Sequence, residues 1–357
     1  MNIHLSLTNT NRSSKLLFIV LVFSFFSCEN EKKQSEKKIR ERVNPADMVW
    51  VEKKRYLHGA KVNDPYAMNR EKPSHHVTVD GFYIDATEVT NKQFEAFVKA
   101  TNYITVAERP IDWEDLKKDL PPGTAKPHDS VLKPGSLIFN KNVEGVVNMR
   151  NFGNWWTWKI GANWRHPQGP KSSIEGKEQY PVVHIAYEDA MAYCKWANRE
   201  LPTEAQWEAA AQGTNNNTIF TWGNDPKLIN QKANTWQGVF PTINNPLDGY
   251  KYISPVKSFP PNSIGIYDMA GNVWEMTSDN YDIDYYKTLA GKSNLLNPKG
   301  AKKSYNPDNP YIQEKIIKGG SFLCNASYCA SYRISAKMGM SPDSGSDHIG
   351  FRTVLQK

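Results

Sequence analysis

The sequence predicts an α+β domain that is rich in loops and has little regular secondary structure. The chain of 357 residues holds 11 Trp, 17 Tyr, 22 Gly and 22 Pro, so aromatic side chains and turn-forming residues are both frequent. Short alternating stretches precede stretches with helical spacing, and no repeat of about 20 to 50 residues is present. These observations favour one continuous mixed domain over a helical bundle or a repeat array.

The N-terminus is typical of an exported protein. An apolar run at residues 16–26 (LLFIVLVFSFF) follows Arg12 and Lys15, and it is too short to cross a bilayer. A serine and Cys28 follow the run, which is the pattern of a bacterial lipoprotein signal. We therefore expect residues 1–27 to be a lipoprotein signal peptide and Cys28 to be lipidated. The alternative is an ordinary signal peptide with an incidental cysteine.

Residues 28–44 lack aromatic side chains and mix both charges, so we expect a disordered charged tether before a folded domain at residues 45–357. Loss of residues 1–27 removes two basic and no acidic side chains, which lowers the formal charge from +7 to +5. No dense basic block with interleaved aromatics suggests a nucleic-acid partner. We expect a monomeric lipoprotein of the bacterial cell envelope, on its periplasmic face or outer surface, that contacts the membrane only through its lipid.

The folded part is expected to begin with a strand and a helix. Residues 77–84 alternate as in a strand, and residues 90–100 have helical spacing. Thr90 is the expected N-cap, with Gln93 as its capping-box partner. The buried stripe of this helix would be Phe94, Phe97 and Val98.

The same order recurs later in the chain. Residues 182–185 predict a buried strand and residues 187–198 a helix, and a second helix at residues 203–212 is capped by Thr203 with Gln206. Five prolines break residues 109–154, so this stretch is expected to be an irregular surface insertion or lid. From residue 213 onward we expect short strands and turns with few helices.

The number and spacing of the cysteines indicate which of them could take part in catalysis or metal binding. Without Cys28, the chain keeps Cys194, Cys324 and Cys329, an odd number for an oxidising compartment, so at least one thiol has no partner within the chain. Cys194 lies on the inward face of a predicted helix, and we interpret it as a small core residue. Cys324 and Cys329 form a C-x4-C pair behind Gly319-Gly320.

Such a pair can form a disulfide, bind a metal or alternate between these states. A structural zinc site normally needs four Cys or His ligands, whereas Cu(I) is satisfied by thiolates alone. The two glycines would allow backbone or substrate to approach closely, Ser321 adds a hydroxyl, and Arg333 and Lys318 could favour a thiolate. Spacing alone leaves a plain disulfide and a reactive pair both open.

Long stretches of the chain resemble the formylglycine-generating enzymes, also called sulfatase-modifying factors, over residues 48–354. They include HHVTVDGFYIDATEVTNKQFEAFVKATNYITVAE (75–108), YPVVHIAYEDAMAYCKWANRELPTEAQWEAAAQG (180–213), GIYDMAGNVWEMTSD (265–279) and GGSFLCNASYCASYR (319–333). The first three are shared with inactive members of the wider superfamily and indicate the fold. The C-x4-C block is the part that is specific for activity.

The resemblance implies a fold similar to C-type lectin domains and an oxidase that uses O2. Its substrate would be a cysteine in a C-x-P-x-R or C-x-A-x-R segment of an unfolded sulfatase, which becomes formylglycine. Cys324 and Cys329 would hold Cu(I), with Cys329 as the lasting anchor and Cys324 near substrate and oxygen. Ser321 would be the active-site serine, and Arg333 would support the site.

The resemblance also implies two Ca²⁺ sites with oxygen ligands only, which suit a hard cation. The first would use Asn234, Asp248 and the carbonyls of Thr235 and Tyr250. The second would use Asp268, Glu275 and the carbonyls of Gly271 and Val273. Without the resemblance, these Asp and Asn residues would be interpreted as turn formers.

Two features depart from the family. Animal members carry disulfides that would pair Cys194 with the position of Thr353, and the position of Ala211 with that of Ile334, so both bridges are absent here. Residues 109–132 also differ from the family. The resemblance therefore assigns no role to this segment, which would form part of the rim of the substrate groove.

Two other functions compete with the oxidase. A non-catalytic envelope lipoprotein could use the same fold as a scaffold, as in gliding and secretion machinery, but such relatives generally lack the cysteine pair. A nonheme-iron sulfoxide synthase would need a separate helical N-terminal domain, where only a tether is expected here. The sequence contains no H-E-x-x-H, phosphate loop or G-x-S-x-G motif, so hydrolase and nucleotide-binding functions receive no support.

Overall fold

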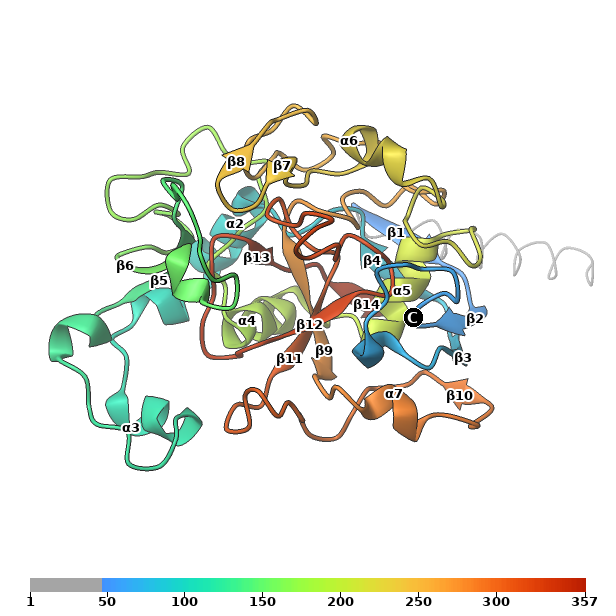
Figure 1. Cartoon of the computed structure of the whole chain (residues 1–357), viewed down its shortest axis with the longest axis horizontal. Helices are drawn as coiled ribbons and strands as arrows, with labels where there is room; N and C mark the ends of the chain where they lie inside the picture. The colour runs from blue at the N-terminus through green and yellow to red at the C-terminus, as the bar shows by residue number, and fades with distance from the viewer. Residues whose placement is uncertain (1–46) are drawn as a thin grey trace, which may run out of the picture. The chain divides into compact units, whose positions relative to one another are not determined.

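The computed structural model describes residues 47–357, so the predicted signal peptide, Cys28 and the predicted tether lie outside the described residues. Residues 49–357 form one compact unit. Short strands and few long helices are joined by many loops (Figure 1), which confirms the predicted α+β class. Within residues 47–357, no helix is both long enough and apolar enough to cross a bilayer.

A four-stranded sheet in the order β12-β11-β9-β13 carries the candidate site. Its strands are β9 (Trp274–Asn280), β11 (Lys315–Lys318), β12 (Lys337–Met340) and β13 (Ile349–Gly350). Strand β11 is antiparallel to β9 and β12, and β13 is parallel to β9. Because β11 ends at Lys318, the sheet determines where the following Gly-Gly turn begins.

Two three-stranded sheets and two hairpins make up the other strands of the described part of the chain. The sheets are β1 (Met48–Val51), β4 (Phe82–Asp85) and β14 (Val354–Gln356), and β10 (Leu295–Leu296), β3 (His75–Val79) and β2 (Lys54–His58). The hairpins are β5 (Gly135–Phe139) with β6 (Trp156–Ile160), and β7 (Gly238–Val239) with β8 (Ile243–Asn244). The prevalence of short strands after residue 213 confirms the prediction for that half.

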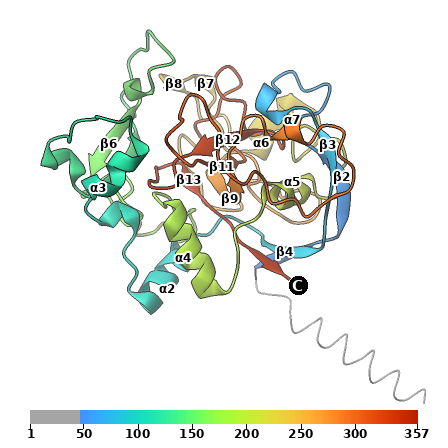
Figure 2. The same cartoon turned by 90° about the horizontal axis from the view of Figure 1, so that it is seen from below.

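Within residues 47–357, three helices exceed two turns: α2 (Asn91–Thr101), α4 (Tyr187–Ala197) and α5 (Glu204–Gln212). Thr90 and Thr203 form the predicted capping boxes with Gln93 and Gln206. Figure 2 shows α2 beside α4, where Phe94 stacks on Tyr193 with ring centroids 6.0 Å apart. The short helices are α3 (Trp113–Leu116), α6 (Ile229–Lys232), α7 (Tyr285–Thr288), and the 3-10 turns η1 (Asn69–Glu71), η2 (Val106–Glu108), η3 (Lys117–Asp119), η4 (Asp129–Leu132), η5 (Phe152–Asn154) and η6 (Pro226–Leu228).

The single strand predicted at residues 77–84 was wrong, because β3 and β4 belong to different sheets. Strand β3 ends at Val79 and β4 begins at Phe82. At Gly81, between the two strands, a Cβ atom would lie 2.3 Å from the ring of Trp50. The alternation of apolar and polar residues continues across this break, so the pattern alone could not reveal it.

The strand predicted at residues 182–185 was also wrong. These residues are buried but form no ladder, because His184 has a φ of 61°. Single hydrogen bonds hold the segment instead: the N–H of Val182 donates to the Val89 carbonyl and that of His184 to the Ser346 carbonyl.

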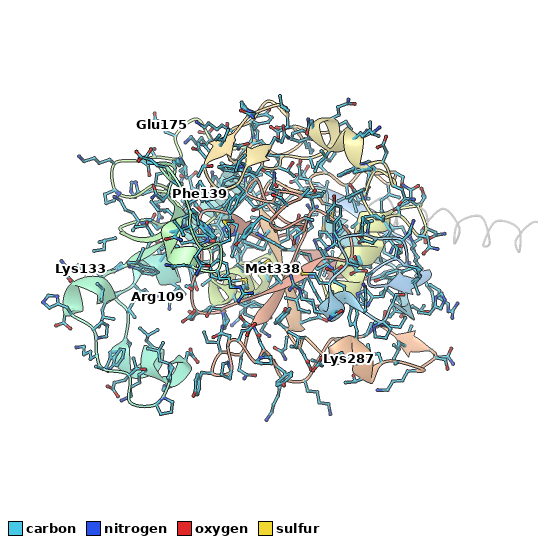
Figure 3. The ribbon with its side chains drawn as sticks, in the orientation of Figure 1. Arg109, Lys133, Phe139, Glu175, Lys287 and Met338 are labelled. Carbon is cyan, nitrogen blue, oxygen red and sulfur yellow. The ribbon has the colours of Figure 1, made fainter. Side chains whose placement is uncertain are left out.

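The stretch predicted to be irregular, residues 109–154, is irregular only in part. It contains α3, the three 3-10 turns η3, η4 and η5, and strand β5 of the β5–β6 hairpin. Arg109 and Lys133 lie near the two ends of the segment that extends from the rest of the unit (Figure 3). Phe139 lies inside the compact part of the unit. Phe139 is buried in an aromatic cluster with Trp155, Trp236 and Phe240.

Cys194 is a core residue, as predicted. Its side chain is 1% exposed and packs in the cluster formed by α2 and α4. Burial raises the pKa of the thiol to about 12. The thiol therefore stays protonated and unreactive at neutral pH.

Candidate active site

The turn after β11 depends on two consecutive glycines with positive φ. Gly319 has a φ of 86° and Gly320 a φ of 71°. A Cβ atom on Gly320 would lie 2.9 Å from the backbone of Ser331 and 3.1 Å from the Sγ of Cys324. The close approach expected from the Gly-Gly pair is thus made by the chain's own backbone, which folds back against the turn.

Ser321 lies at the start of the cysteine loop and is fully buried. Its N–H donates to the Sγ of Cys324 at 3.4 Å, and its carbonyl accepts the N–H of Cys324 at 2.9 Å. The hydroxyl oxygen accepts the N–H of Leu323 at 3.3 Å. Ser321 therefore holds the sulfur of Cys324 in place through its backbone.

The sulfur atoms of Cys324 and Cys329 face each other at 2.7 Å and form no disulfide. Cys324 is 2% exposed, whereas Cys329 is half-buried. A hydrogen bond from the Cys324 thiol lowers the pKa of Cys329, and burial raises the pKa of Cys324. The pair thus favours one thiolate, on Cys329, with the remaining proton between the sulfurs.

Asn325 organises the loop that connects Cys324 to Cys329. Sequence reasoning missed this residue. Its carbonyl accepts the N–H groups of Tyr328, Cys329 and Ala330. Its side-chain amide donates to the carbonyls of Trp236 and Gly238, at 3.0 and 3.2 Å. Asn325 therefore ties the cysteine loop to the segment that leads into β7. No spacing rule in the sequence marks this role.

Arg333 does not direct its charge at the thiolates, contrary to the expectation from sequence. Its guanidinium binds Asp64 at 2.6 Å and Glu71 at 2.7 and 2.8 Å, all buried. Its Nε donates to the carbonyl of Ala330 at 2.9 Å. Ala330 has a φ of 39°, so this bond supports a strained residue directly after Cys329. Arg333 thus stabilises the backbone conformation of the cysteine loop.

Lys318 is also turned away from the sulfurs. It is fully buried and binds Glu208 at 2.8 Å. Glu204 and Glu208 with His58 form the one group of three His, Cys or acidic side chains close enough to share a metal within residues 47–357. Lys318 and Lys337 already neutralise both carboxylates, so this group is a paired polar core.

The cysteine pair consequently offers a donor set of two sulfurs, without a third His, Cys or acidic ligand within reach among residues 47–357. This set is too small for structural zinc and is of the soft type that selects Cu(I). Of the two residues, Cys329 is the partly exposed one.

The residues expected at the first calcium site lie together. Asp248 accepts the N–H groups of Thr235 and Tyr250, both at 2.9 Å, so its carboxylate joins the two residues whose carbonyls are expected to bind the ion. Asn234 donates its amide to the Tyr252 carbonyl. Its buried Oδ1 has no hydrogen-bond partner among the described residues. An unpaired amide oxygen beside a carboxylate fits a hard cation.

The second expected site contains an additional carboxylate, Glu88, that sequence reasoning missed. Asp268 and Glu275 lie close enough to Glu88 to raise its pKa further, above the effect of burial, and burial raises the pKa of Asp268 to about 6. Glu275 is paired with Arg352 at 2.6 Å. Glu88 Oε2 is buried and unpaired within residues 47–357. Both oxygens of Glu275 accept hydrogen bonds from Arg352, so the unpaired oxygen of Glu88 near Asp268 is the observation that fits a bound cation. Glu88 precedes the α2 capping box, where nothing in the sequence marks a ligand.

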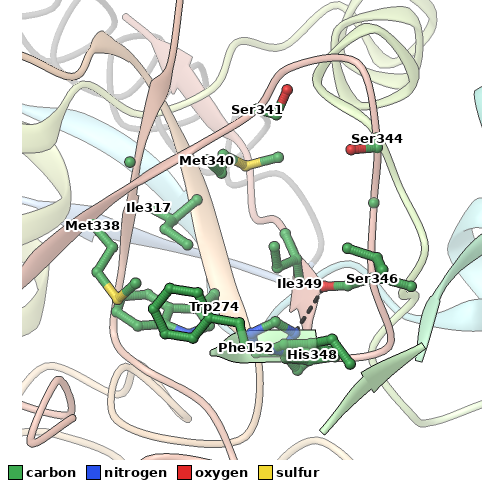
Figure 4. Close-up of a pocket in the computed structure, with 14 residues that line it drawn as sticks. Phe152, Trp274, Ile317, Met338, Met340, Ser341, Ser344, Ser346, His348 and Ile349 are labelled. Atoms are coloured by element: carbon green, nitrogen blue, oxygen red, sulfur yellow. Dashed lines mark hydrogen bonds between the residues drawn. The ribbon is translucent and has the colours of Figure 1, made fainter. Parts of the chain in front are cut away.

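An apolar pocket of about 310 Å³ lies between the β5–β6 hairpin, β11–β12 and residues 341–349, and neither cysteine lines it. Figure 4 shows Trp274 and Met338 on its wall, and the hydrogen bond of 2.7 Å between Ser346 and His348. Trp274 and Ile317 also pack in the core cluster that includes Cys324. The pocket therefore borders the same core cluster as Cys324 but is lined by no cysteine.

Comparisons with known proteins find relatives over most of the chain. The family described as "Sulfatase-modifying factor enzyme 1-like domain" matches residues 33–357. A formylglycine-generating enzyme of Mus musculus is 40% identical over 285 residues, 79% of this chain and 68% of that protein. One of Mycobacterium tuberculosis is 42% identical over 286 residues, 80% of this chain and 90% of that protein.

Two further relatives limit what similarity alone can say. A Bos taurus protein named "Inactive C-alpha-formylglycine-generating enzyme 2" is 34% identical over 293 residues, 81% of this chain and 82% of that protein. The solved structure of PvdO from Pseudomonas aeruginosa aligns with a TM-score of 0.56 at 23% identity, covering 86% of this chain and 93% of that one. The latter supports the fold only, so activity must be argued from the cysteine pair.

Proposed function

This chain belongs to the family of formylglycine-generating enzymes, and from this membership we propose that it oxidises a cysteine of sulfatase polypeptides to formylglycine. The chain is accordingly an oxidoreductase whose partner is a sulfatase. The substrate cysteine would lie in an unfolded C-x-P-x-R or C-x-A-x-R segment. The observation that supports activity, rather than only a shared fold, is the unbridged sulfur pair of Cys324 and Cys329 at 2.7 Å.

Cys324 and Cys329 are the residues that would hold Cu(I), because they are soft donors with no competing hard ligand. Bound there, copper would supply the redox chemistry with O2. Cys329 is half-buried and has a lowered pKa, so a substrate thiol would approach this sulfur. The resemblance instead implies that substrate and oxygen lie near Cys324, which is 2% exposed and held by the N–H of Ser321. Asn325 and Arg333 keep the two sulfurs in one loop.

Ca²⁺ would be held at two places that flank this loop. The first would use Asn234 and Asp248, and the second Asp268 and Glu275 with Glu88 nearby. Unpaired buried oxygens at Asn234 and Glu88 support this assignment. The ions would clamp segments with little ladder hydrogen bonding. We also propose that the chain is an envelope lipoprotein attached to the membrane through Cys28.

The activity is tested by incubating the purified protein with Cu(I), O2, a thiol reductant and a peptide containing C-x-P-x-R. The thiol-to-aldehyde change removes two electrons and O2 reduction to water takes four, so the reductant supplies the other two. Conversion lowers the peptide mass by about 18 units, which mass spectrometry detects. The same peptide with Ser in place of Cys should stay unchanged.

The variants Cys329→Ser and Cys324→Ser should both abolish conversion. Cys194→Ser is the matched control, because that thiol lies in the core and should be dispensable for turnover. An unchanged peptide with fully copper-loaded wild-type protein would reject the oxidase proposal and favour a non-catalytic scaffold.

A further inference from the structure

Three chain segments that are distant in sequence lie side by side at the cysteine turn. The N–H of Asn272 donates to the carbonyl of Asn234, and the N–H of Gly271 donates to that of Gly319, each at 2.9 Å. On the other side, the N–H of Phe322 donates to the carbonyl of Asn272 at 2.9 Å. A central strip made of Gly271 and Asn272 therefore joins a residue of the first cation site to the backbone of the cysteine turn.

The strip has no room to adapt. Gly271 packs so closely that an added Cβ would lie 2.1 Å from the carbonyl oxygen of Asn234. Asn272 has a φ of 57°, a conformation that Asn and Gly tolerate better than other residues. Its side chain is fully buried. Such close packing leaves the strip little room to absorb a displacement at either cation site.

The side chain of Asn272 also contacts both cation sites. Its amide donates to Glu88 Oε1 at 3.0 Å, beside Asp268 and Glu275. Its Oδ1 accepts the Asn234 amide at 3.3 Å and both the N–H and the hydroxyl of Ser254, at 3.0 and 3.1 Å. Asn272 is therefore hydrogen-bonded, through side chain and backbone, to each cation site and to the cysteine turn.

We propose that Asn272 is a positioning residue that couples occupancy of the two cation sites to the geometry of the Cys324–Cys329 pair. The ligand is a divalent cation of the Ca²⁺ type, and the coupled element is the turn at residues 319–322. The inference rests on the proposed function only for the use to which the cysteines are put. The coupling itself is a property of binding and thiol reactivity, and is measurable without turnover.

The test measures thiol alkylation of the full chain, anaerobic and reduced, in Ca²⁺ or in EGTA. Peptide mass spectrometry gives the rate for each cysteine. We expect Ca²⁺ to slow alkylation of Cys329 about tenfold, within the range of coupling between linked sites. Cys194 is the internal control, because its reaction reports global unfolding and should stay slow in both solutions.

The variant Asn272→Gly keeps the positive φ but removes every side-chain contact, so the Ca²⁺ effect on Cys329 should disappear. Asn198→Gly is the matched control, since Asn198 has a φ of 53° at the exposed end of α4 and should retain the tenfold effect. Asn272→Asp keeps the acceptor for Ser254 but loses the donor to Glu88. It should reduce the effect to about threefold, and it serves if the glycine variant does not fold.

The proposal is overturned if Ca²⁺ leaves Cys329 reactivity of the wild-type protein unchanged, or if Asn272→Gly and Asn272→Asp both keep the full effect. An effect that tracks Cys194 would equally reject it, because the ion would then act on global stability. Peptide oxidation is scored separately. A coupled but inactive protein would reject the proposed function and keep this inference, and an active but uncoupled protein would do the reverse.

Discussion

At the scale of single residues, the two thiols of the candidate site behave as one acid. Cys324 is inside and Cys329 is half-buried, so burial penalises charge more strongly on the former. The hydrogen bond between their sulfurs lowers the pKa of Cys329. The lowered pKa thus belongs to the more exposed residue of the pair.

This asymmetry predicts a pH effect. In Cys324→Ala the hydrogen bond that lowers the pKa of Cys329 is lost, so the midpoint of its alkylation rate should move to higher pH. The rate with iodoacetamide is measured from pH 5 to 10. Ser327→Ala alters the same loop without touching sulfur and should keep the wild-type midpoint. Equal midpoints in Cys324→Ala and wild type would contradict the shared-proton description.

At the scale of elements, the Gly-Gly turn is held by contacts as well as by backbone conformation. Gly320 and Gly265 both have positive φ, 71° and 90°. Only Gly320 has atoms within 3.1 Å of its missing Cβ, whereas the space at Gly265 is open. The two positions therefore separate the cost of conformation from the cost of crowding.

We expect Gly320→Ala to lower the free energy of unfolding by at least about 2 kcal/mol more than Gly265→Ala, because only the former also forces the turn apart. Guanidinium denaturation of both variants gives the difference. The alanine at residue 320 should also increase the alkylation rate of Cys324. Equal destabilisation of the two variants would show that the turn tolerates the added methyl group.

A second prediction at this scale concerns the buried segment at residues 182–185. His184 is fully buried, and burial lowers its pKa to about 4 from the ordinary value near 6.5. The folded state therefore keeps His184 neutral while the unfolded chain takes up a proton below pH 6.5. Its contribution to stability is present above pH 6.5 and is lost as pH falls toward 4, by up to about 1.4 kcal/mol per pH unit.

The variant His184→Asn, which tolerates positive φ, should be less stable at pH 7 but lose less stability between pH 6.5 and 4. Urea denaturation at several pH values measures both slopes. His76→Asn, at an exposed position, is the control and should keep the wild-type slope. A slope unchanged in His184→Asn would mean that the burial of this ring does not contribute to acid sensitivity.

At the scale of the whole molecule, the proposed lipid anchor at Cys28 would attach the enzyme to a membrane. Cys28→Ala should move the protein from the membrane fraction to the soluble fraction and abolish labelling with a radioactive fatty acid, because acylation needs the thiol. Oxidation of a C-x-P-x-R peptide by the purified variant should be unchanged. Wild-type protein that is soluble and unlabelled would reject the lipoprotein assignment.

Much of the fold followed from local rules that the sequence states directly. The capping boxes at Thr90 and Thr203 and the inward position of Cys194 were predicted correctly, because each depends on neighbours within one turn of helix. The strand at residues 182–185 and the continuous strand at residues 77–84 were predicted wrongly. In both, the apolar pattern reports burial, while a single backbone conformation decides whether a ladder forms.

The sequence by itself determined the family, the fold class and the pair of cysteines that the chemistry would need, since these are properties of residue type and spacing. Only the tertiary structure decided that Arg333 pairs with Asp64 and Glu71, that Glu88 joins the second cation site and that Asn272 touches all three sites. Buried polar groups must find partners, and those partners come from segments up to 269 residues away. Such pairs cannot be predicted from spacing along the chain, because the packing of the core brings them together.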